Sequence, residues 1–176
     1  MELVKELGNG YSIKKASLTE DILKKVMVID DSFYLDTITP FSWYTERYSE
    51  YNEGLFLIKD NIGDKQPIGY IIAVPITETL YDAISDGVMV GDTQINPDMI
   101  LKAEKSDYMY LVSCVVMEPY RRKGFGTELA KLALSRYNSY ITCMTVSKGG
   151  YKLMDKLMEH KIDLPHGVSI FNRRFV

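Results

Sequence analysis

The order of apolar and polar residues along the chain predicts an alternation of strands and helices. Short apolar runs bounded by polar turns predict strands at 3–7, 11–16, 55–59, 68–76, 108–117, 140–146 and 168–176. Apolar residues at helical spacing predict helices after Ser17 and at about 40–51, 127–137 and 149–160. Strands and helices mixed in this order favour an α/β or α+β protein built on one central sheet.

Local signals predict how several of these elements begin and join. Asn9-Gly10 between two apolar runs predicts a type I′ hairpin turn. Ser17 and Glu20 have the spacing of a capping box, and Thr39-Pro40 is typical of a helix start. We expect the helix after Ser17 to present one apolar face: Ile22, Leu23, Val26 and Met27. The last helix is expected to turn four residues toward the core: Leu153, Met154, Leu157 and Met158.

The connection from Thr77 to Asp107 is long for a compact domain. It carries seven acidic residues and two lysines. A short helix at 79–85 and a helical turn at 97–101 are predicted within it. Connections of this length usually have structure or function of their own. The acidic balance would suit an amine-bearing ligand, and the alternative is a solvated excursion that covers a sheet edge.

A basic, glycine-bearing turn joins the apolar run at 111–117 to the predicted helix at 127–137. Its sequence is Arg121-Arg122-Lys123-Gly124-Phe125-Gly126. The N–H groups at a helix N-terminus lack partners, and the helix dipole makes that end positive. Because glycine lets the backbone approach closely, this turn predicts an anion site.

Two common phosphate motifs are excluded here. No Gly-x-x-x-x-Gly-Lys-Ser/Thr string is present, and Leu129 stands where a dinucleotide fingerprint needs its third glycine. The remaining pattern is Arg-x-x-Gly-x-Gly after a strand that contains Val115-Val116. The stretch 115–126 resembles the acyl-CoA pyrophosphate loop of the GNAT superfamily of N-acetyltransferases. The order of elements resembles that fold over nearly the whole chain, and the motifs over about 108–160.

This resemblance implies a mixed central sheet of about six to seven strands, with splayed fourth and fifth strands, flanked by about four helices. We expect a single domain over 1–176, with 77–107 as an unusual connection. The resemblance also implies acetyl-CoA as co-substrate. The residues that match the cofactor motif are Cys114, Val115, Val116, Arg121, Arg122, Lys123, Gly124, Phe125, Gly126, Thr127, Ser147, Gly150 and Met154.

The resemblance assigns roles to these positions. The backbone of Cys114–Val116 would hold the pantetheine arm, and an N–H near Val115 would polarise the thioester carbonyl. The N–H groups of 121–127 would hold the pyrophosphate. An unprotonated acceptor amine would then attack the thioester directly.

The catalytic acid and base of the family are not in their common places. The family often places a proton-donating tyrosine where this chain has Met154, which cannot donate a proton. Tyr151, one helical turn away, is the candidate replacement. No carboxylate or histidine lies in 108–117, where the family often has a glutamate near Tyr110. The candidate bases are Glu53, Asp107, another acid of 77–107, or a chain of water molecules.

Aromatic residues are the candidates for the acceptor wall. The second helix carries an aromatic stripe, Phe41, Tyr44, Tyr48 and Tyr51, which is more often core than site. By resemblance, Trp43, Tyr44 and Tyr110 are the residues expected to face the acceptor. The first interpretation is an acetyl-CoA-dependent N-acetyltransferase acting on a primary amine of a small molecule or peptide. The alternatives are a non-catalytic acyl-CoA-binding module and a partner-binding protein without a cofactor.

Composition narrows the possible ligands and the expected location of the protein. The net charge of −3 and the lack of a basic stripe argue against nucleic-acid binding. No apolar run approaches a membrane span, and the first ten residues do not predict a secretory signal. Cys114 and Cys143 have no metal-ligand spacing, so we expect no metal and two reduced thiols in a cytoplasmic protein. We expect no membrane partner, and a monomer or homodimer.

Overall fold

The structure is a computed structural model. It describes residues 1–33, 41–48, 51, 53–63, 66–89, 91, 94–101, 106–137 and 139–173, without the side chains of 41, 43, 47 and 48. The predicted helix start at Thr39-Pro40 lies outside the described residues.

Eight strands of the described chain form one sheet, in the order β1-β2-β3-β4-β5-β6-β8-β7. The pairs β1–β2, β2–β3, β3–β4, β6–β8 and β8–β7 are antiparallel, and β5 and β6 pair in parallel. The strands are β1 Glu2–Gly8, β2 Tyr11–Ala16, β3 Leu55–Asp60, β4 Pro67–Pro75, β5 Tyr108–Val116, β6 Tyr140–Thr145, β7 Glu159–Asp163 and β8 Ser169–Arg173. A mixed sheet with helices confirms the predicted fold class, with one or two strands more than expected.

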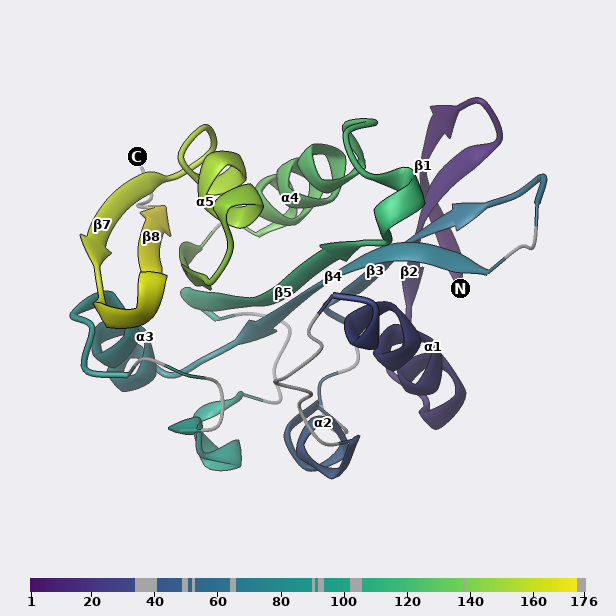
Figure 1. The fold of residues 1–176 in the computed structure, drawn as a ribbon. Helices are drawn as coiled ribbons and strands as arrows, with labels where there is room; N and C mark the ends of the chain where they lie inside the picture. Colours follow the sequence, from purple (N-terminus) through teal and green to yellow (C-terminus); the bar gives the residue numbers. More distant parts are fainter. Residues whose placement is uncertain are drawn as a thin grey trace. The chain divides into compact units, whose positions relative to one another are not determined.

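The α-helices of the described residues follow the predicted pattern with shifted ends (Figure 1). They are α1 Glu20–Asp31, α2 Phe41–Tyr48, α3 Glu78–Ser85, α4 Phe125–Arg136 and α5 Lys148–Met154. None of them is long and apolar enough to cross a bilayer. Every residue of β4 is buried, as expected of a central strand covered on both faces.

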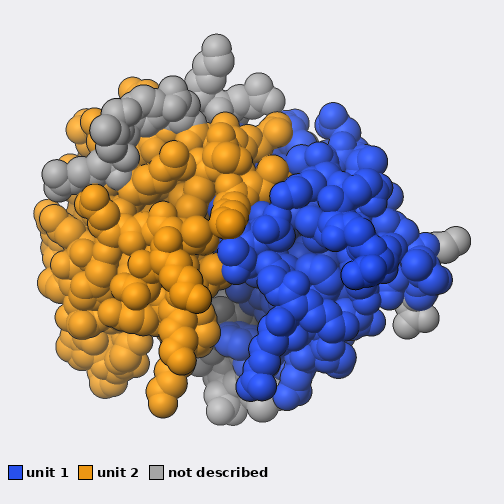
Figure 2. Space-filling model, turned by 90° about the horizontal axis from the view of Figure 1, so that it is seen from above, with its two compact units in different colours: residues 1–72, 113–130 blue, residues 73–112, 131–176 orange. Residues whose placement is uncertain are grey.

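The chain divides into two compact units, coloured separately in Figure 2. The first comprises Met1–Ile72 and Ser113–Ala130, and the second comprises Ala73–Val112 and Lys131–Val176. The strands β4 and β5 each contribute residues to both units. The expectation of a single domain stays a prediction.

The N-terminal hairpin forms as predicted. Asn9 and Gly10 have φ of 52° and 79°, the left-handed values that a type I′ turn needs at both central residues. The predicted capping box is wrong by two residues. Thr19, rather than Ser17, accepts a hydrogen bond from the N–H of Ile22 and caps α1.

Helix α1 buries a slightly different face from the predicted one. Leu23 and Val26 are buried as expected, together with Ile29 and Asp30, while Ile22 and Met27 are only half-buried. A buried carboxyl near the end of an amphipathic helix was not predicted.

The last predicted helix is too long. Helix α5 ends at Met154, and residues 159–160 belong to the strand β7 instead. The apolar spacing misled the prediction because Met158 is buried outside the helix, where the Cys143 thiol lies 3.8 Å from its sulfur. All five residues of β7 are exposed, so this edge strand has no apolar alternation to detect.

The acidic connection contains the two predicted helical pieces. Thr77 caps α3, which buries Leu80, Tyr81, Ile84 and Ser85. A 3-10 turn forms at Pro97–Met99, and Ile100 then bridges back to Ile76. Helix α3 is therefore a packed part of the second unit rather than a solvated excursion.

Strands β5 and β6 pair over only part of their length. The register begins at Tyr108 opposite Tyr140 and ends at Leu111 opposite Cys143. Strand β5 then continues to Val116 and β6 to Thr145. The fourth and fifth strands of the family's order, which flank the basic turn and its helix, are β5 and β6 here, and the partial register fits the divergence expected of them.

Candidate active site

The basic turn has the backbone geometry of an anion site. A 3-10 turn at Glu118–Tyr120 leads into it, and Arg122 and Gly124 have φ of 62° and 85°. Left-handed residues within a turn can direct successive N–H groups into one concavity, the kind that binds anions. The first hydrogen bond of α4 runs from the N–H of Glu128 to the carbonyl of Gly124, at 3.0 Å. Three N–H groups, those of 125–127, precede that bond and point out of the helix start.

The basic side chains of the turn are held in different ways. The Nε of Arg121 donates to the carbonyl of Val116 at 2.9 Å, and its guanidinium lies 5.0 Å from the ring centre of Phe33. The Nζ of Lys123 lies 5.2 Å from the ring centre of Tyr120. Arg121 therefore fastens the turn to the end of β5, while Lys123 stays at the surface beside the helix start.

The N-terminal hairpin forms a wall beside the turn. The rings of Tyr11 and Phe125 lie 4.8 Å apart, and Lys5 forms an ion pair with Glu128 in the first turn of α4. A hollow of about 440 Å³ opens here, lined by Leu7, Gly8, Asn9, Tyr11, Lys123 and Phe125. Sequence reasoning did not connect the hairpin with the turn, because nothing in the local pattern of residues 5–11 refers to residues more than 100 positions later.

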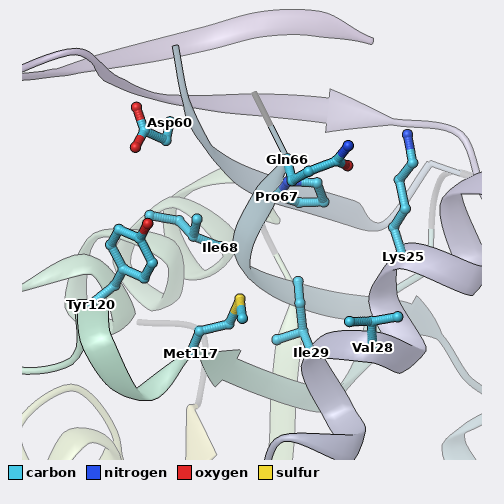
Figure 3. Close-up of a pocket in the computed structure, with 9 residues that line it drawn as sticks. All are labelled: Lys25, Val28, Ile29, Asp60, Gln66, Pro67, Ile68, Met117 and Tyr120. Carbon is cyan, nitrogen blue, oxygen red and sulfur yellow. The ribbon is translucent and has the colours of Figure 1, made fainter. Parts of the chain in front are cut away.

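A second cavity, of about 370 Å³, lies in the same unit (Figure 3). Residues of α1, β4 and the turn after β5 surround it, as the sticks in the close-up show. The lining residues are Lys25, Val28, Ile29, Asp60, Gln66, Pro67, Ile68, Met117 and Tyr120. The walls are mostly apolar, and Tyr120 connects this cavity to the basic turn.

The end of β5 is tightly packed against β4. A Cβ added to Gly69 would lie 2.9 Å from the carbonyl oxygen of Val115 and 3.2 Å from the Cγ2 of Val116. Only glycine fits this approach without moving the strand predicted to hold the pantetheine arm. Burial raises the pKa of the Cys114 thiol to about 12, so this thiol stays protonated at neutral pH and is unsuited to be a nucleophile.

The predicted residues after β6 form a capped helix start in the second unit. The hydroxyl of Ser147 accepts from the N–H of Gly150 at 3.0 Å and caps α5. Met154 is buried. The ring of Tyr151 is half-buried and lies 5.3 Å from that of Phe171 and 5.9 Å from that of His160. The roles of these residues in cofactor binding and proton transfer stay predictions.

The candidate bases and acceptor residues lie in different surroundings. Glu53 forms an ion pair with Lys15, and Asp107 is exposed. Tyr110 is buried in the core, and the hydroxyl of Tyr44 donates to buried Asp30 at 2.9 Å. The side chain of Trp43 lies outside the described residues. None of these observations places Tyr44 or Tyr110 at a surface that an acceptor could reach directly.

Comparison with known proteins identifies the family. The sequence model of the Acetyltransferase (GNAT) family matches residues 26–148, more than half of the chain. The chain belongs to the GNAT family. No curated protein matches this GNAT chain by sequence.

Solved structures with the same fold share little sequence with this GNAT protein. The loading GNATL domain of CurA from Lyngbya majuscula has a TM-score of 0.69 at 10% identity, over 95% of this chain and 98% of that one. A mosquito arylalkylamine N-acetyltransferase like 5b gives 0.65 at 16%, over 93% and 99%. Arabidopsis thaliana Naa50, in complex with the bisubstrate analogue CoA-Ac-MVNAL, has a TM-score of 0.61 at 15% identity, over 94% of this chain and 99% of that one. These likenesses extend the family match to the fold of nearly the whole chain.

Proposed function

We propose that this GNAT protein is an acetyl-CoA-dependent N-acetyltransferase that transfers the acetyl group to a primary amine of a small molecule or peptide. The geometry of the basic turn carries this proposal. Two left-handed residues, a helix start and three basic side chains meet at one place. Backbone N–H groups at a helix start suit a pyrophosphate, which is the largest charged group of acetyl-CoA.

The proposal assigns roles to individual residues, as the family resemblance implies. The N–H groups of 124–127 hold the pyrophosphate, and Lys123 adds charge beside it. The backbone of Cys114–Val116 binds the pantetheine arm, and the N–H near Val115 stabilises the oxyanion of the tetrahedral intermediate. The acceptor nitrogen attacks the acetyl carbon, the C–N bond forms, the C–S bond breaks, and CoA leaves as the thiolate. Tyr151 is the side chain proposed to protonate it.

Relatives of similar fold support an amine acceptor without deciding its size. One is described as an arylalkylamine N-acetyltransferase like protein, and another is bound to an analogue that joins CoA to a peptide. The acidic connection 77–107 is proposed to contact the acceptor through its residues after α3, because α3 itself is packed on the sheet. A cytoplasmic location is part of the same proposal.

Met154 is the observation that favours a second candidate function. Since a methionine stands at the usual tyrosine position, a non-catalytic acyl-CoA-binding module is the alternative. Two measurements distinguish the enzyme from the non-catalytic module. Calorimetric titration measures the binding of acetyl-CoA, and mass spectrometry detects acetylation of three amines: phenylethylamine, spermidine and the peptide Met-Val-Asn-Ala-Leu. Binding with acetylation of an amine supports the enzyme. Binding without acetylation supports the alternative, and absence of binding refutes both.

A further inference from the structure

A buried carboxyl in the first unit is unexplained by the proposed mechanism. Asp30 lies in the last turn of α1 and is 5% exposed. A carboxylate is disfavoured there twice, because burial removes its hydration and the C-terminal end of a helix is negative. The last turn of α1 carries no basic residue to offset this. A group kept under such conditions is a candidate for function.

Hydroxyl groups from three other elements surround this carboxyl or connect to it. Tyr44 of α2 donates to it at 2.9 Å, and Tyr70 of β4 donates to its other oxygen. The hydroxyl of Tyr70 also lies 3.0 Å from that of Ser113 on β5. Asp31, on the same helix, is the charged neighbour that acts on Asp30, and no described basic group is among the causes of its pKa shift.

The directions of these hydrogen bonds follow from the number of protons. The single hydroxyl proton of Tyr70 is donated to Asp30, so Ser113 is the donor to Tyr70. The chain of donors therefore runs from Ser113 through Tyr70 to Asp30. The oxygen of Ser113 keeps the capacity to accept a further proton at its outer end.

Ser113 is the accessible end of this chain. It is half-buried, whereas Tyr70 and Asp30 are buried. It immediately precedes Cys114, whose backbone is proposed to hold the pantetheine arm, and consecutive Cα atoms lie about 3.8 Å apart. Of the three residues, Ser113 is therefore the one adjacent in sequence to the strand segment proposed to hold the thioester.

We propose that Ser113, Tyr70 and Asp30 form a relay that takes the proton from the attacking amine. This inference rests on the proposed acetyl transfer. As the C–N bond forms and the C–S bond breaks, the amine proton passes to the Ser113 oxygen. The Ser113 proton passes to Tyr70, the Tyr70 proton passes to Asp30, and the leaving thiolate takes a proton from Tyr151 or solvent. Ser113 is the catalytic residue, while Tyr70 and Asp30 act through it as positioning residues.

The electrostatics of the carboxyl fit this role. Burial raises the pKa of Asp30 above its ordinary value of 3.8, and the hydrogen bonds from Tyr70 and Tyr44 oppose the rise. A carboxylate with a raised pKa is a better proton acceptor near neutral pH than an exposed aspartate. Burial also holds the pKa of Tyr70 well above its usual range, so Tyr70 passes protons on without becoming an anion.

Kinetics of four variants test the relay with the amine that gives the highest wild-type rate. Tyr70→Phe and Ser113→Ala are expected to lower kcat by about 100-fold or more, the lower range for general base catalysis, with little change in KM. Ser113→Thr keeps a hydroxyl and should restore most of the rate. Tyr44→Phe removes only a donor to Asp30, so it should shift the acidic limb of the pH–rate profile to higher pH.

A matched control separates this role from a loss of stability. Ser85→Ala removes another buried hydroxyl, one that donates to Asn172 in the second unit, and it should leave kcat and the pH profile unchanged. Wild-type kcat in Tyr70→Phe or Ser113→Ala, with acetyl-CoA binding and transfer intact, overturns the relay and leaves the proposed function standing. Absence of acetyl-CoA binding in the wild type overturns both.

A measurement without turnover tests the relay independently. Carbon-13 NMR of carboxyl-labelled aspartate, with the Asp30 signal assigned from its loss in Asp30→Asn, reports the titration of this one group. We expect it to titrate above 3.8 and to shift its titration in Ser113→Ala and on addition of acetyl-CoA. A titration that responds to neither change overturns the relay even if no tested amine is acetylated.

Discussion

Replacing Gly124 by alanine tests the anion site through its backbone. Gly124 has a φ of 85°, and an added Cβ would meet no heavy atom within 4 Å. The substitution therefore introduces backbone strain and no steric clash. A left-handed conformation costs an alanine about 1–2 kcal/mol, and the stiffer unfolded chain offsets about 0.4–1 kcal/mol of that. The free energy of unfolding should fall by about 1 kcal/mol.

The effect on cofactor binding should be larger than this strain alone. If the turn relieves the strain by rotating, at least one N–H turns away from the pyrophosphate. A hydrogen bond to a charged group contributes about 1.5–3 kcal/mol, so the Kd for acetyl-CoA should rise about 10- to 150-fold. Isothermal titration calorimetry gives the Kd, and urea denaturation of the same samples gives the unfolding free energy.

Gly167 supplies a matched control for the strain. Its φ is 76°, and an added Cβ would likewise meet nothing within 4 Å, but it lies in the turn before β8 in the second unit. Gly167→Ala should lose a similar amount of stability and keep the wild-type Kd. A Gly124→Ala protein that binds acetyl-CoA within about twofold of wild type would refute the placement of the pyrophosphate, since twofold is only about 0.4 kcal/mol.

Three further predictions concern β5, Tyr151 and Asp30. Gly69→Ala should displace the carbonyl of Val115, destabilise the fold by about 1–3 kcal/mol and weaken acetyl-CoA binding. The control Gly149→Ala, whose Cβ would meet nothing closer than 4.0 Å, should keep the wild-type Kd. Equal Kd values for the two variants in calorimetry would contradict this prediction. Tyr151→Phe should lower kcat if Tyr151 protonates the thiolate, and a full rate in steady-state kinetics would leave solvent as the donor. Because the pKa of Asp30 is raised in the folded state, its stabilising contribution is complete below about pH 4 and is lost as pH rises through the folded-state pKa. Urea denaturation should therefore show the wild-type protein losing stability relative to Asp30→Asn over that pH range. A stability difference that does not depend on pH would contradict this prediction.

Much of the fold could be predicted because the relevant signals are local. The two-residue turn at Asn9-Gly10 sets the register of the first hairpin, and the strand β4 is recognisable from its continuous apolar run. The basic turn was predicted for the same reason, since the strand, the glycines and the helix are adjacent in sequence. Its left-handed residue Gly124 lies where the pattern placed a glycine-dependent turn.

The parts that could not be predicted depend on contacts between distant segments. Strand β7 is exposed on every residue and owes its place to pairing with β8, so no periodicity marks it. Asp30 looks like one more polar residue of an amphipathic helix, and only the fold brings Tyr44, Tyr70 and Ser113 into one network with it. The candidate bases drawn from the sequence, Glu53 and the acids of 77–107, therefore did not include this carboxyl.

A crystal structure of the protein with CoA bound is the measurement that tests the central claim most directly. The account predicts pyrophosphate oxygens within about 2.7–3.2 Å of backbone nitrogens of residues 124–127. It also predicts the pantetheine arm along the backbone of Cys114–Val116, with the thiol nearer to Ser113 than to any described carboxylate. Pyrophosphate density away from the start of α4, with those nitrogens turned from the ligand, would contradict the account.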